Sequence, residues 1–428
     1  MSAVDPSLYE EIIIESSSGR TVDITQGVVM IDYYEDLFSP TITAKLQVVN
    51  MGYTITGADG ELQTIYNGLP LRGGEKVILK IKPNSTSNIK LDFQFFVSSI
   101  SNVIVKNKTE SFTLNVISPT AISNETSRVG KKYPSSTKIS DSVKDIFDNY
   151  LTSEKNIVCD LTQNVYGFIG NMRKPFTVLF WLASKSVPES SEAGSTAGYL
   201  FYETKSKFSF RSIDSLIDSS PIAVYHYNEV IQSGTGQDFK ILKYNTSLNE
   251  DVLGKLQRGA YSSYRIFFDP LTLEYTDPTK GAFGLEDYAS KNPKKGKSST
   301  LGKDVVLPAN LGESPSRYIT AVLDRGTMEQ NASKKENADP FVTQSQSMMR
   351  YNSLFSQTVR MTIPLNSNLE AGNLIECNFP LSDDNQKDVN KQDKEQSGLY
   401  MIKELCHHFD TMGSYTSLTL IKDTFGSK

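Results

Sequence analysis

The sequence of 428 residues predicts an α+β fold that is mainly β, with antiparallel sheets at both ends and a mixed α+β region between them. Three observations support this prediction. Apolar and polar residues alternate along short runs near each end, helical spacing appears in the middle, and three C-terminal runs repeat the pattern of three N-terminal runs. A two-residue period is typical of strands with one wet face, and a 3.6-residue period of helices.

Residues 1–118 are predicted to form the first β domain. Four runs alternate between apolar and polar residues, and turns rich in glycine, proline and asparagine separate them. The runs are "TITAKLQVVN" (41–50), "KVILKIK" (76–82), "LDFQFFV" (91–97) and "SFTLNV" (111–116).

The pattern changes at Pro119, and residues 119–225 are predicted to form a mixed α+β domain. "ISDSVKDIFDNYL" has apolar residues at helical spacing, with Ser140 as candidate N-cap. "KPFTVLFWLASKS" is a second helix with Pro175 in its first turn. "GYLFYETKSKFSFRSID" is then expected to form a hairpin.

Residues 226–320 are predicted to be an irregular, partly β linking domain. "YNTSLNEDVLGKLQRGAYSS" could begin with a helix, and "RIFFDPLTLEYTD" has the pattern of strands. The lysine-rich run 290–305 is either a solvated loop or a phosphate-binding patch. Residues 321–428 are the second β domain, with a helix near 342–357 and a long charged loop at 381–397.

Residues 72–116 and 370–422 share one pattern of three strands in the same order with matching turns. This internal similarity predicts a duplicated module. The matched positions are Gly74 with Gly372, Val77 with Ile375, Pro83 with Pro380, Val97 with Ile402, Ile100 with Leu405, Ile104 with Phe409, Leu114 with Leu418 and Val116 with Leu420.

The stretch "ELCHHF" (404–409) is the only place where a cysteine and two histidines come together. The repeat places it on a strand, so His407 and His408 face opposite sides of the sheet and cannot bind one tetrahedral metal. Cys406 shares a face with His408, which is too few ligands for a zinc site. Asp383, Asp384 and Asp388 lack the rest of a calcium loop. We therefore expect no metal site.

The sequence also lacks the motifs of common enzyme classes. It has no Gly-x-Ser-x-Gly elbow, no Gly-rich phosphate loop ending in Lys-Ser/Thr, and no His-Glu-x-x-His. We accordingly predict no catalytic residues and no cofactor. A paired-carboxylate hydrolase site stays open, because spacing alone does not reveal one.

The amino-acid composition argues against several other classes of protein. The net charge of −5 argues against a general nucleic-acid binder. Three cysteines are too few for a disulfide scaffold, which favours reduced thiols in a cytoplasmic setting. The polar start is unlike a signal peptide, and the longest apolar run, "VLFWLA", is too short for a membrane-spanning segment.

Several stretches resemble the baseplate hub proteins of contractile-tailed phages of the T-even type, which are related to the N-terminal part of type VI secretion spike proteins. They extend from about residue 28 to 423. They are "YYEDLFSPTITAKLQV", "NETSRVGKKY", "RKPFTVLFWLASKSV", "GYLFYETKSKFSFRSID", "LQRGAYSSYRIFFDP" and "SGLYMIKELCHHFD" with "YTSLTLIKD". The long loops at 278–305 and 381–397 depart from the family pattern.

This resemblance implies two tail-tube-like antiparallel β-barrel domains and a homotrimer whose six tube-like domains imitate sixfold symmetry. Its implied partners are a trimeric central spike, a hexameric tail tube, baseplate wedge proteins and the tape measure, with DNA only passing through the lumen. The implied location is the tail baseplate of the virion, after synthesis in the host cytoplasm. The resemblance implies a structural role without enzymatic activity.

The segment "YYEDLFSP" (33–40) is the candidate protein interface, with Tyr34, Leu37, Phe38 and Pro40 as its residues. Large apolar groups at a loop tip either pack into their own core or mark a contact surface. Our hypothesis is that Leu37 and Phe38 contact the tube or a neighbouring chain.

Two other functions compete with the structural one. A tail-associated cell-wall hydrolase would fit the tip of a phage tail, but the missing motifs and only three histidines count against it. A β-rich carbohydrate-binding or adhesion module is supported only by the 21 tyrosines, and the single tryptophan counts mildly against it.

Overall fold

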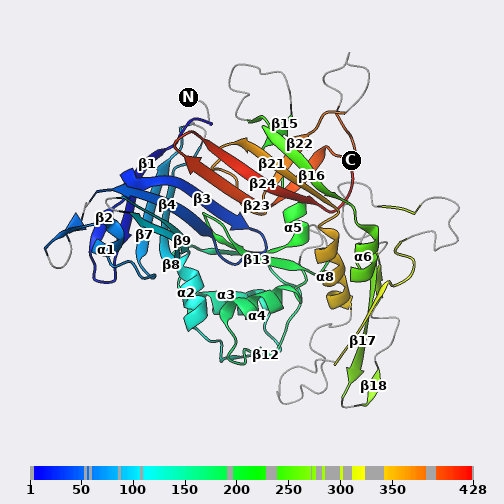
Figure 1. The fold of residues 1–428 in the computed structure, drawn as a ribbon. Coiled ribbons are helices and arrows are strands. Elements are labelled where there is room, and N and C mark those ends of the chain that lie inside the picture. The colour runs from blue at the N-terminus through cyan, green and yellow to red at the C-terminus, as the bar shows by residue number, and fades with distance from the viewer. Residues whose placement is uncertain are drawn as a thin grey trace.

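In the described part of the chain, one continuous sheet of thirteen strands brings together strands from the N-terminal and the C-terminal regions (Figure 1). The computed structural model describes residues 4–52, 55–56, 60–84, 88–106, 109–189, 196–227, 239–270, 272–275, 282–284, 299–301, 311–322, 342–381 and 392–426. The strands of the sheet are β1 (Leu8–Glu15), β2 (Thr21–Asp23), β3 (Val28–Asp36), β4 (Thr43–Met51), β7 (Lys76–Lys82), β8 (Leu91–Lys106), β9 (Thr109–Ile117), β15 (Val224–His226), β16 (Lys243–Asn249), β21 (Gln357–Pro364), β22 (Leu374–Asn378), β23 (Gly398–Asp410) and β24 (Ser414–Lys422).

Twelve of the thirteen strands form two modules of six strands with the same order, and β2 adds to the outer edge of β1. In the N-terminal module the order across the sheet is β3-β4-β9-β8-β7-β1, and in the C-terminal module it is β16-β21-β24-β23-β22-β15. The six strands also follow each other along the chain in the same sequence. One pairing differs, because β1 is antiparallel to β7 whereas β15 is parallel to β22. The predicted duplication is confirmed and includes three more strands than the sequence pattern revealed.

As far as Ile100 and Leu405, the registers of the two modules agree residue by residue with the sequence alignment. The cross-strand pairs Val77–Phe95, Val97–Val116 and Ile100–Leu114 correspond to Ile375–Tyr400, Ile402–Leu420 and Leu405–Leu418. The matched glycines also bond alike, because the Gly74 N–H donates to the Val97 carbonyl over 2.7 Å and the Gly372 N–H donates to the Ile402 carbonyl over 2.8 Å. Both glycines have left-handed φ angles, 91° and 82°, which favour glycine over other residues.

One matched pair is wrong. Both modules have a β-bulge in the first half of the long strand, between Val97 and Ser99 and between Ile402 and Glu404. β8 has a second bulge between Ser101 and Ile104, with Asn102 in the left-handed region at φ 52°, and β23 has no counterpart to it. The extra residue shifts the alignment by one, so Phe409 corresponds to Val105 rather than to Ile104.

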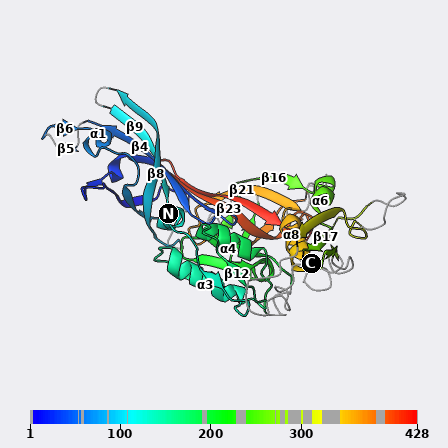
Figure 2. The ribbon, with the colours of Figure 1, turned by 90° about the horizontal axis from the view of Figure 1, so that it is seen from below.

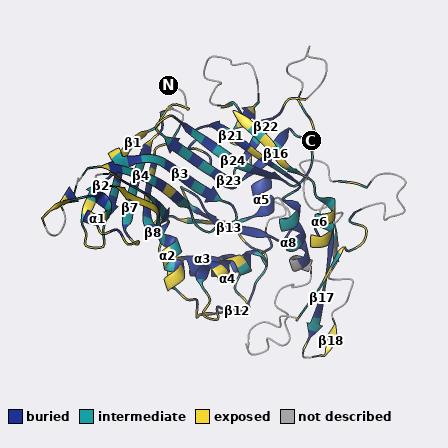
Figure 3. Ribbon diagram, viewed as in Figure 1, coloured by how far each residue is buried: buried dark blue, intermediate teal, exposed yellow. Residues whose placement is uncertain are grey.

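The two modules join side by side through backbone pairing. The second half of β23 pairs antiparallel with β3, with Leu405 opposite Glu35, Cys406 opposite Tyr34 and Phe409 opposite Ile31. Buried side chains of both modules form one hydrophobic cluster. Along β3 and β23 buried residues alternate with less buried ones, as Figure 3 shows. The two β domains, predicted as separate units, are therefore joined in one sheet.

The middle region between the modules is mixed α+β, as predicted. Its elements are α2 (Pro119–Thr126), β10 (Lys132–Tyr133), α3 (Ile139–Tyr150), β11 (Ile157–Cys159), β12 (Phe168–Ile169), α4 (Pro175–Ala183), β13 (Tyr199–Glu203), β14 (Phe208–Ser212) and α5 (Ile213–Ile217). β13 and β14 form the predicted hairpin. Figures 1 and 2 show α3 and α4 on one side of the large sheet, near β13.

The two predicted helices of the middle region, α3 and α4, begin close to their predicted starts. Pro175 occupies the first turn of α4, as expected. Ser140 is not the N-cap of α3, because the helix begins at Ile139 and has no side-chain cap. The backbone N–H of Ser140 donates instead to the Thr162 hydroxyl, 3.0 Å away, so tertiary packing replaces the cap.

An inserted unit separates β16 from β21 in the C-terminal module. Its described elements are α6 (Val252–Arg258), β17 (Ser262–Asp269), β18 (Glu274–Tyr275), β19 (Ala282–Gly284), β20 (Arg317–Val322) and α8 (Val342–Ser353). The matching connection in the N-terminal module is only the short turn between β3 and β4. The smaller elements β5 (Ile55–Thr56), β6 (Leu62–Gln63), α1 (Ile65–Gly68) and the 3-10 turn Thr25–Gly27 complete the described chain.

Two predicted segments in this part of the chain need correction. Residues 243–249 form strand β16 of the C-terminal module, and the helix begins only at Val252. The region 226–320 therefore contributes a strand to the second β domain as well as linking elements. Most of the lysine-rich run, most of the loop 381–397, and Asp383, Asp384 and Asp388 lie outside the described residues.

Candidate functional site

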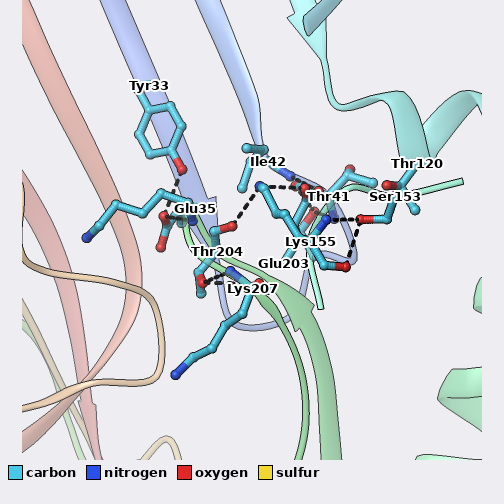
Figure 4. A network of polar contacts seen from close by, with 12 residues as sticks. Tyr33, Glu35, Thr41, Ile42, Thr120, Ser153, Lys155, Glu203, Thr204 and Lys207 are labelled. Carbon is cyan, nitrogen blue, oxygen red and sulfur yellow. Dashed lines mark hydrogen bonds and ion pairs between the residues drawn. The ribbon is translucent and has the colours of Figure 1, made fainter. Parts of the chain in front are cut away.

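Three parts of the chain meet at the buried carboxylate of Glu35 on β3 (Figure 4). Its oxygens accept hydrogen bonds from the Tyr33 hydroxyl (2.7 Å) and from two backbone N–H groups, those of Lys205 (2.7 Å) and Ala371 (2.8 Å). Lys205 lies in the β13–β14 turn of the middle region, and Ala371 precedes β22 of the C-terminal module. One side chain thus fixes the relative position of both modules and the middle region.

A second buried carboxylate supports the same junction. Glu203, at the end of β13, accepts a hydrogen bond from the Ile42 backbone N–H (3.1 Å) and pairs with the Lys155 ammonium (2.8 Å), as Figure 4 shows. Ile42 lies just before β4, so this contact ties the β3–β4 turn to the middle region. Such charge-assisted bonds are strong when buried, and losing one partner leaves the other uncompensated.

Burial changes the proton affinity of two groups at this junction in opposite senses. It raises the pKa of Glu35 to about 7, although the nearby Lys205 ammonium opposes the rise. It lowers the pKa of His407, which stacks on Tyr33, to about 3, and here Lys205 adds to the effect. His407 Nδ1 contacts the Thr416 hydroxyl, and Nε2 has no hydrogen-bond partner among the described residues.

These shifts predict opposing pH dependences of stability. The contribution of Glu35 to the free energy of unfolding rises as the pH falls from about 7 to 4.5. The contribution of His407 falls as the pH drops from 6.5 toward about 3. Each changes by about 1.4 kcal/mol per pH unit. The two largely cancel between pH 6.5 and 4.5. When the pH falls from 6.5 to 5, the free energy of unfolding of Glu35→Gln should therefore decrease by about 2 kcal/mol more than that of the parent. That of His407→Leu should decrease by about 2 kcal/mol less than that of the parent.

Denaturant unfolding of the parent and both variants at pH 6.5 and pH 5 measures these differences. The two variants serve as controls for each other because their changes have opposite signs. Equal pH dependences in all three proteins would contradict the two shifted pKa values.

The stretch "ELCHHF" lies on strand β23, as predicted, and its two histidines face opposite sides. His407 is fully buried in the core. His408 lies on the other face, where Nδ1 is 2.6 Å from Asp32 and Nε2 is 3.1 Å from Asp410. Its ring stacks on Tyr415 at 4.4 Å between centroids. Among the described residues no group of three or more His, Cys, Asp or Glu side chains is placed to hold a metal ion.

The four predicted interface residues fall in different environments. Leu37 is fully buried, and its backbone N–H donates to the Lys403 carbonyl, 2.7 Å away. Phe38 is half-buried with its ring centroid 5.6 Å from that of Phe355, and Tyr34 and Pro40 are also half-buried. Of the two alternatives for Leu37, the structure therefore supports packing into its own core rather than a role at the surface. Contacts of Tyr34, Phe38 and Pro40 with other chains stay a prediction.

Leu37 and Phe38 line an open apolar pocket of about 350 Å³. The pocket lies where the β3–β4 turn meets α4, β13 and the end of α8, and its wall includes Phe180, Tyr351 and Phe355. The partners of Leu37 thus come from segments more than 140 residues away, a proximity that local sequence patterns do not reveal.

Two of the strand edges that lack a described partner belong to β8 and β16. The second half of β8, from Ser99 to Lys106, pairs with β9 on one side, and on the other β7 ends its pairing at Phe96. β16 pairs with β21 and forms the end of the described sheet. Val103, Ile104 and Val105 of the first edge are 40%, 63% and 50% exposed. Apolar residues on an unpaired edge are typical of surfaces that pair with another chain.

The backbone fold is similar to that of solved phage tail proteins. A tail protein from Neisseria meningitidis MC58 superposes with a TM-score of 0.52 at 9% identity, covering 96% of each chain. The 43 kDa tail protein of prophage MuSo2 from Shewanella oneidensis gives 0.52 at 10% identity, covering 96% of this chain and 98% of the other. The chain has the fold of these tail proteins.

A third structure is similar at a lower score. It is the E. coli c3393 protein, described as a type VI secretion component with structural similarity to T4 bacteriophage tail proteins gp27 and gp5, at a TM-score of 0.42 and 9% identity over 94% of this chain and 76% of the other. No protein-family model and no curated protein matches the sequence. No helix in the described part of the chain is long and apolar enough to span a membrane.

Proposed function

We propose that this protein is a structural hub of a contractile phage tail baseplate, in which three copies form a closed ring. Six modules of one topology would then surround a channel. Such a ring offers a sixfold surface to a hexameric tail tube and a threefold surface to a trimeric central spike. Baseplate wedge proteins and the tape measure are further proposed partners, and DNA passes through the channel without specific binding.

The observation that supports this proposal is the head-to-tail pairing of the two modules within one chain. β3 of the N-terminal module pairs with β23 of the C-terminal module, so the two modules contribute different edges. A contact between unlike surfaces generates either a ring or an open fibre when it is repeated. The resemblance of the sequence to baseplate hub proteins favours the ring. In this role the protein acts through assembly and catalyses no reaction.

Solution mass tests the trimer directly. Light scattering after size-exclusion chromatography should give three times the chain mass of 47.6 kDa. A mass of one chain or of two chains at all accessible concentrations would contradict the ring. Turnover of peptidoglycan by the purified protein would contradict the purely structural role and favour the hydrolase.

Two finer assignments stay part of the proposal. The division into the regions 1–118, 119–225, 226–320 and 321–428 is the first of them. The half-buried Tyr34, Phe38 and Pro40 are proposed to contact a neighbouring chain or the tube. The proposed location is the baseplate of the virion tail.

A further inference from the structure

We infer that neighbouring copies join by pairing the second half of β8 in one chain with β16 in the next chain. This inference rests on the proposed ring and identifies the two edges that would form it. The partner is a second copy of this chain, because the chain already makes the equivalent contact with itself. β8 corresponds to β23 and β16 corresponds to β3, and β23 pairs with β3.

Both edges required for this joint lack a described partner. In β23, residues 398–401 pair with β22, and residues 404–410 on the same edge pair with β3. In β8, residues 91–96 pair with β7 in the same way, but residues 99–106 meet no described strand on that edge. β16 uses one edge for β21, as β3 uses one edge for β4. Each free edge is therefore the counterpart of an occupied one.

The module alignment fixes the register of the inferred joint. Leu248 takes the place of Tyr34, because Leu248 pairs with Thr358 on β21 as Tyr34 pairs with Thr43 on β4. Ser101 takes the place of Cys406 by the same comparison of β8 and β23. Since Cys406 lies opposite Tyr34, Ser101 should lie opposite Leu248 of the next chain.

At the other end of the joint, Val105 replaces Phe409. Tyr244 replaces Ile31, because Tyr244 pairs with Met361 as Ile31 pairs with Leu46. Phe409 lies opposite Ile31, so Val105 should lie opposite Tyr244 of the next chain.

Both free edges carry one extra residue over this span. From Cys406 to Phe409 is three residues and from Tyr34 to Ile31 is three, whereas from Ser101 to Val105 is four and from Leu248 to Tyr244 is four. The extra residue of β8 lies in its bulge between Ser101 and Ile104, and that of β16 lies in its bulge between Thr246 and Leu248. Neither bulge has a counterpart at the occupied joint. Because the two insertions have equal length, the strands stay in register at both ends.

Burial is consistent with a missing neighbour at this edge. Phe409 is fully buried at the occupied joint, whereas its counterpart Val105 is 50% exposed. Pairing with β16 of another chain would cover Val105 and its neighbour Ile104, which is 63% exposed. The two joints would differ chemically, since His408 contacts Asp32 and Asp410 at the occupied one and the inferred one has Asn245 in place of Asp32.

A disulfide across the inferred joint tests the register. The variant S101C/L248C is made in a chain with C159S and C406S, and it is oxidised with copper phenanthroline. Opposed residues on antiparallel strands have Cα atoms about 4.5–5.5 Å apart, which suits a disulfide. We expect chains linked up to a covalent trimer on a non-reducing denaturing gel, and monomers after reduction.

The matched control is S101C/T246C. Thr246 corresponds to Tyr33, whose side chain faces the opposite side of the sheet from Tyr34, so this pair should form no cross-link. If the parent and S101C/L248C are both trimeric but the variant does not cross-link, or links no better than the control, the strand joint alone is contradicted. A parent that light scattering finds monomeric contradicts the ring as well.

Discussion

Replacing Arg350 with alanine is expected to lower the free energy of unfolding by about 3–5 kcal/mol. Arg350 on α8 is 1% exposed and lies between two buried carboxylates. It bonds Asp214 of α5 at 2.9 Å and 3.0 Å and Asp423, just after β24, at 3.0 Å. Alanine would leave both carboxylates in the interior without their counter-charge. The interaction joins the inserted unit, the middle region and the C-terminal module, so the loss should affect all three.

Denaturant unfolding followed by the fluorescence of Trp181, the single tryptophan, measures this loss. The matched control is Arg258→Ala, because Arg258 pairs with Asp251 at 3.7 Å while both side chains are about half exposed. That change should cost less than about 1 kcal/mol. The triple variant R350M/D214N/D423N should recover much of the stability, since it leaves no buried charge unpaired. A triple variant as unstable as R350A would contradict the electrostatic explanation.

Replacing Val105 with aspartate is expected to convert the trimer into monomers. In a single chain Val105 is half exposed, so a carboxylate there remains hydrated and the fold is unaffected. In the inferred joint the same carboxylate would be buried opposite the uncharged side chain of Tyr244. A burial cost of roughly 3 kcal/mol per joint weakens association by more than about 100-fold.

Light scattering over a concentration series measures this change, and the melting temperature of the monomer checks the fold. The control is Met412→Asp in the β23–β24 turn, where the side chain is 86% exposed and no joint is inferred. The control should remain trimeric. A V105D protein that stays trimeric at the parent's concentrations would contradict the assignment of this edge.

The sequence alignment predicted the modules well where both copies keep one alternating pattern. The pairs Val97–Val116 and Ile402–Leu420 occupy the same position because strand periodicity is preserved on both sides. The alignment failed after Asn102, because a bulge adds a residue without disturbing the local alternation of apolar residues.

Contacts between segments that are distant along the chain could not be predicted from the sequence patterns. β3 and β23 pair across about 370 residues, and the burial of Leu37 depends on Leu200 and Leu354. β16 resembled the start of a helix because "YNTSLN" has neither a clean two-residue nor a helical period. The prediction that His407 and His408 face opposite sides of the sheet required only the alternation of side chains along one strand. This placement is confirmed.

The unequal connections of the two modules have a consequence for how such a chain can specialise. The N-terminal module links β3 to β4 by a short turn, whereas the C-terminal module has more than a hundred residues between Asn249 and Gln357. Six identical subunits would have to carry any added domain six times, and neighbouring copies would crowd one another. A fused pair can accept the addition on every second unit, so bulky appendages gain space between them while the wall beneath stays uniform.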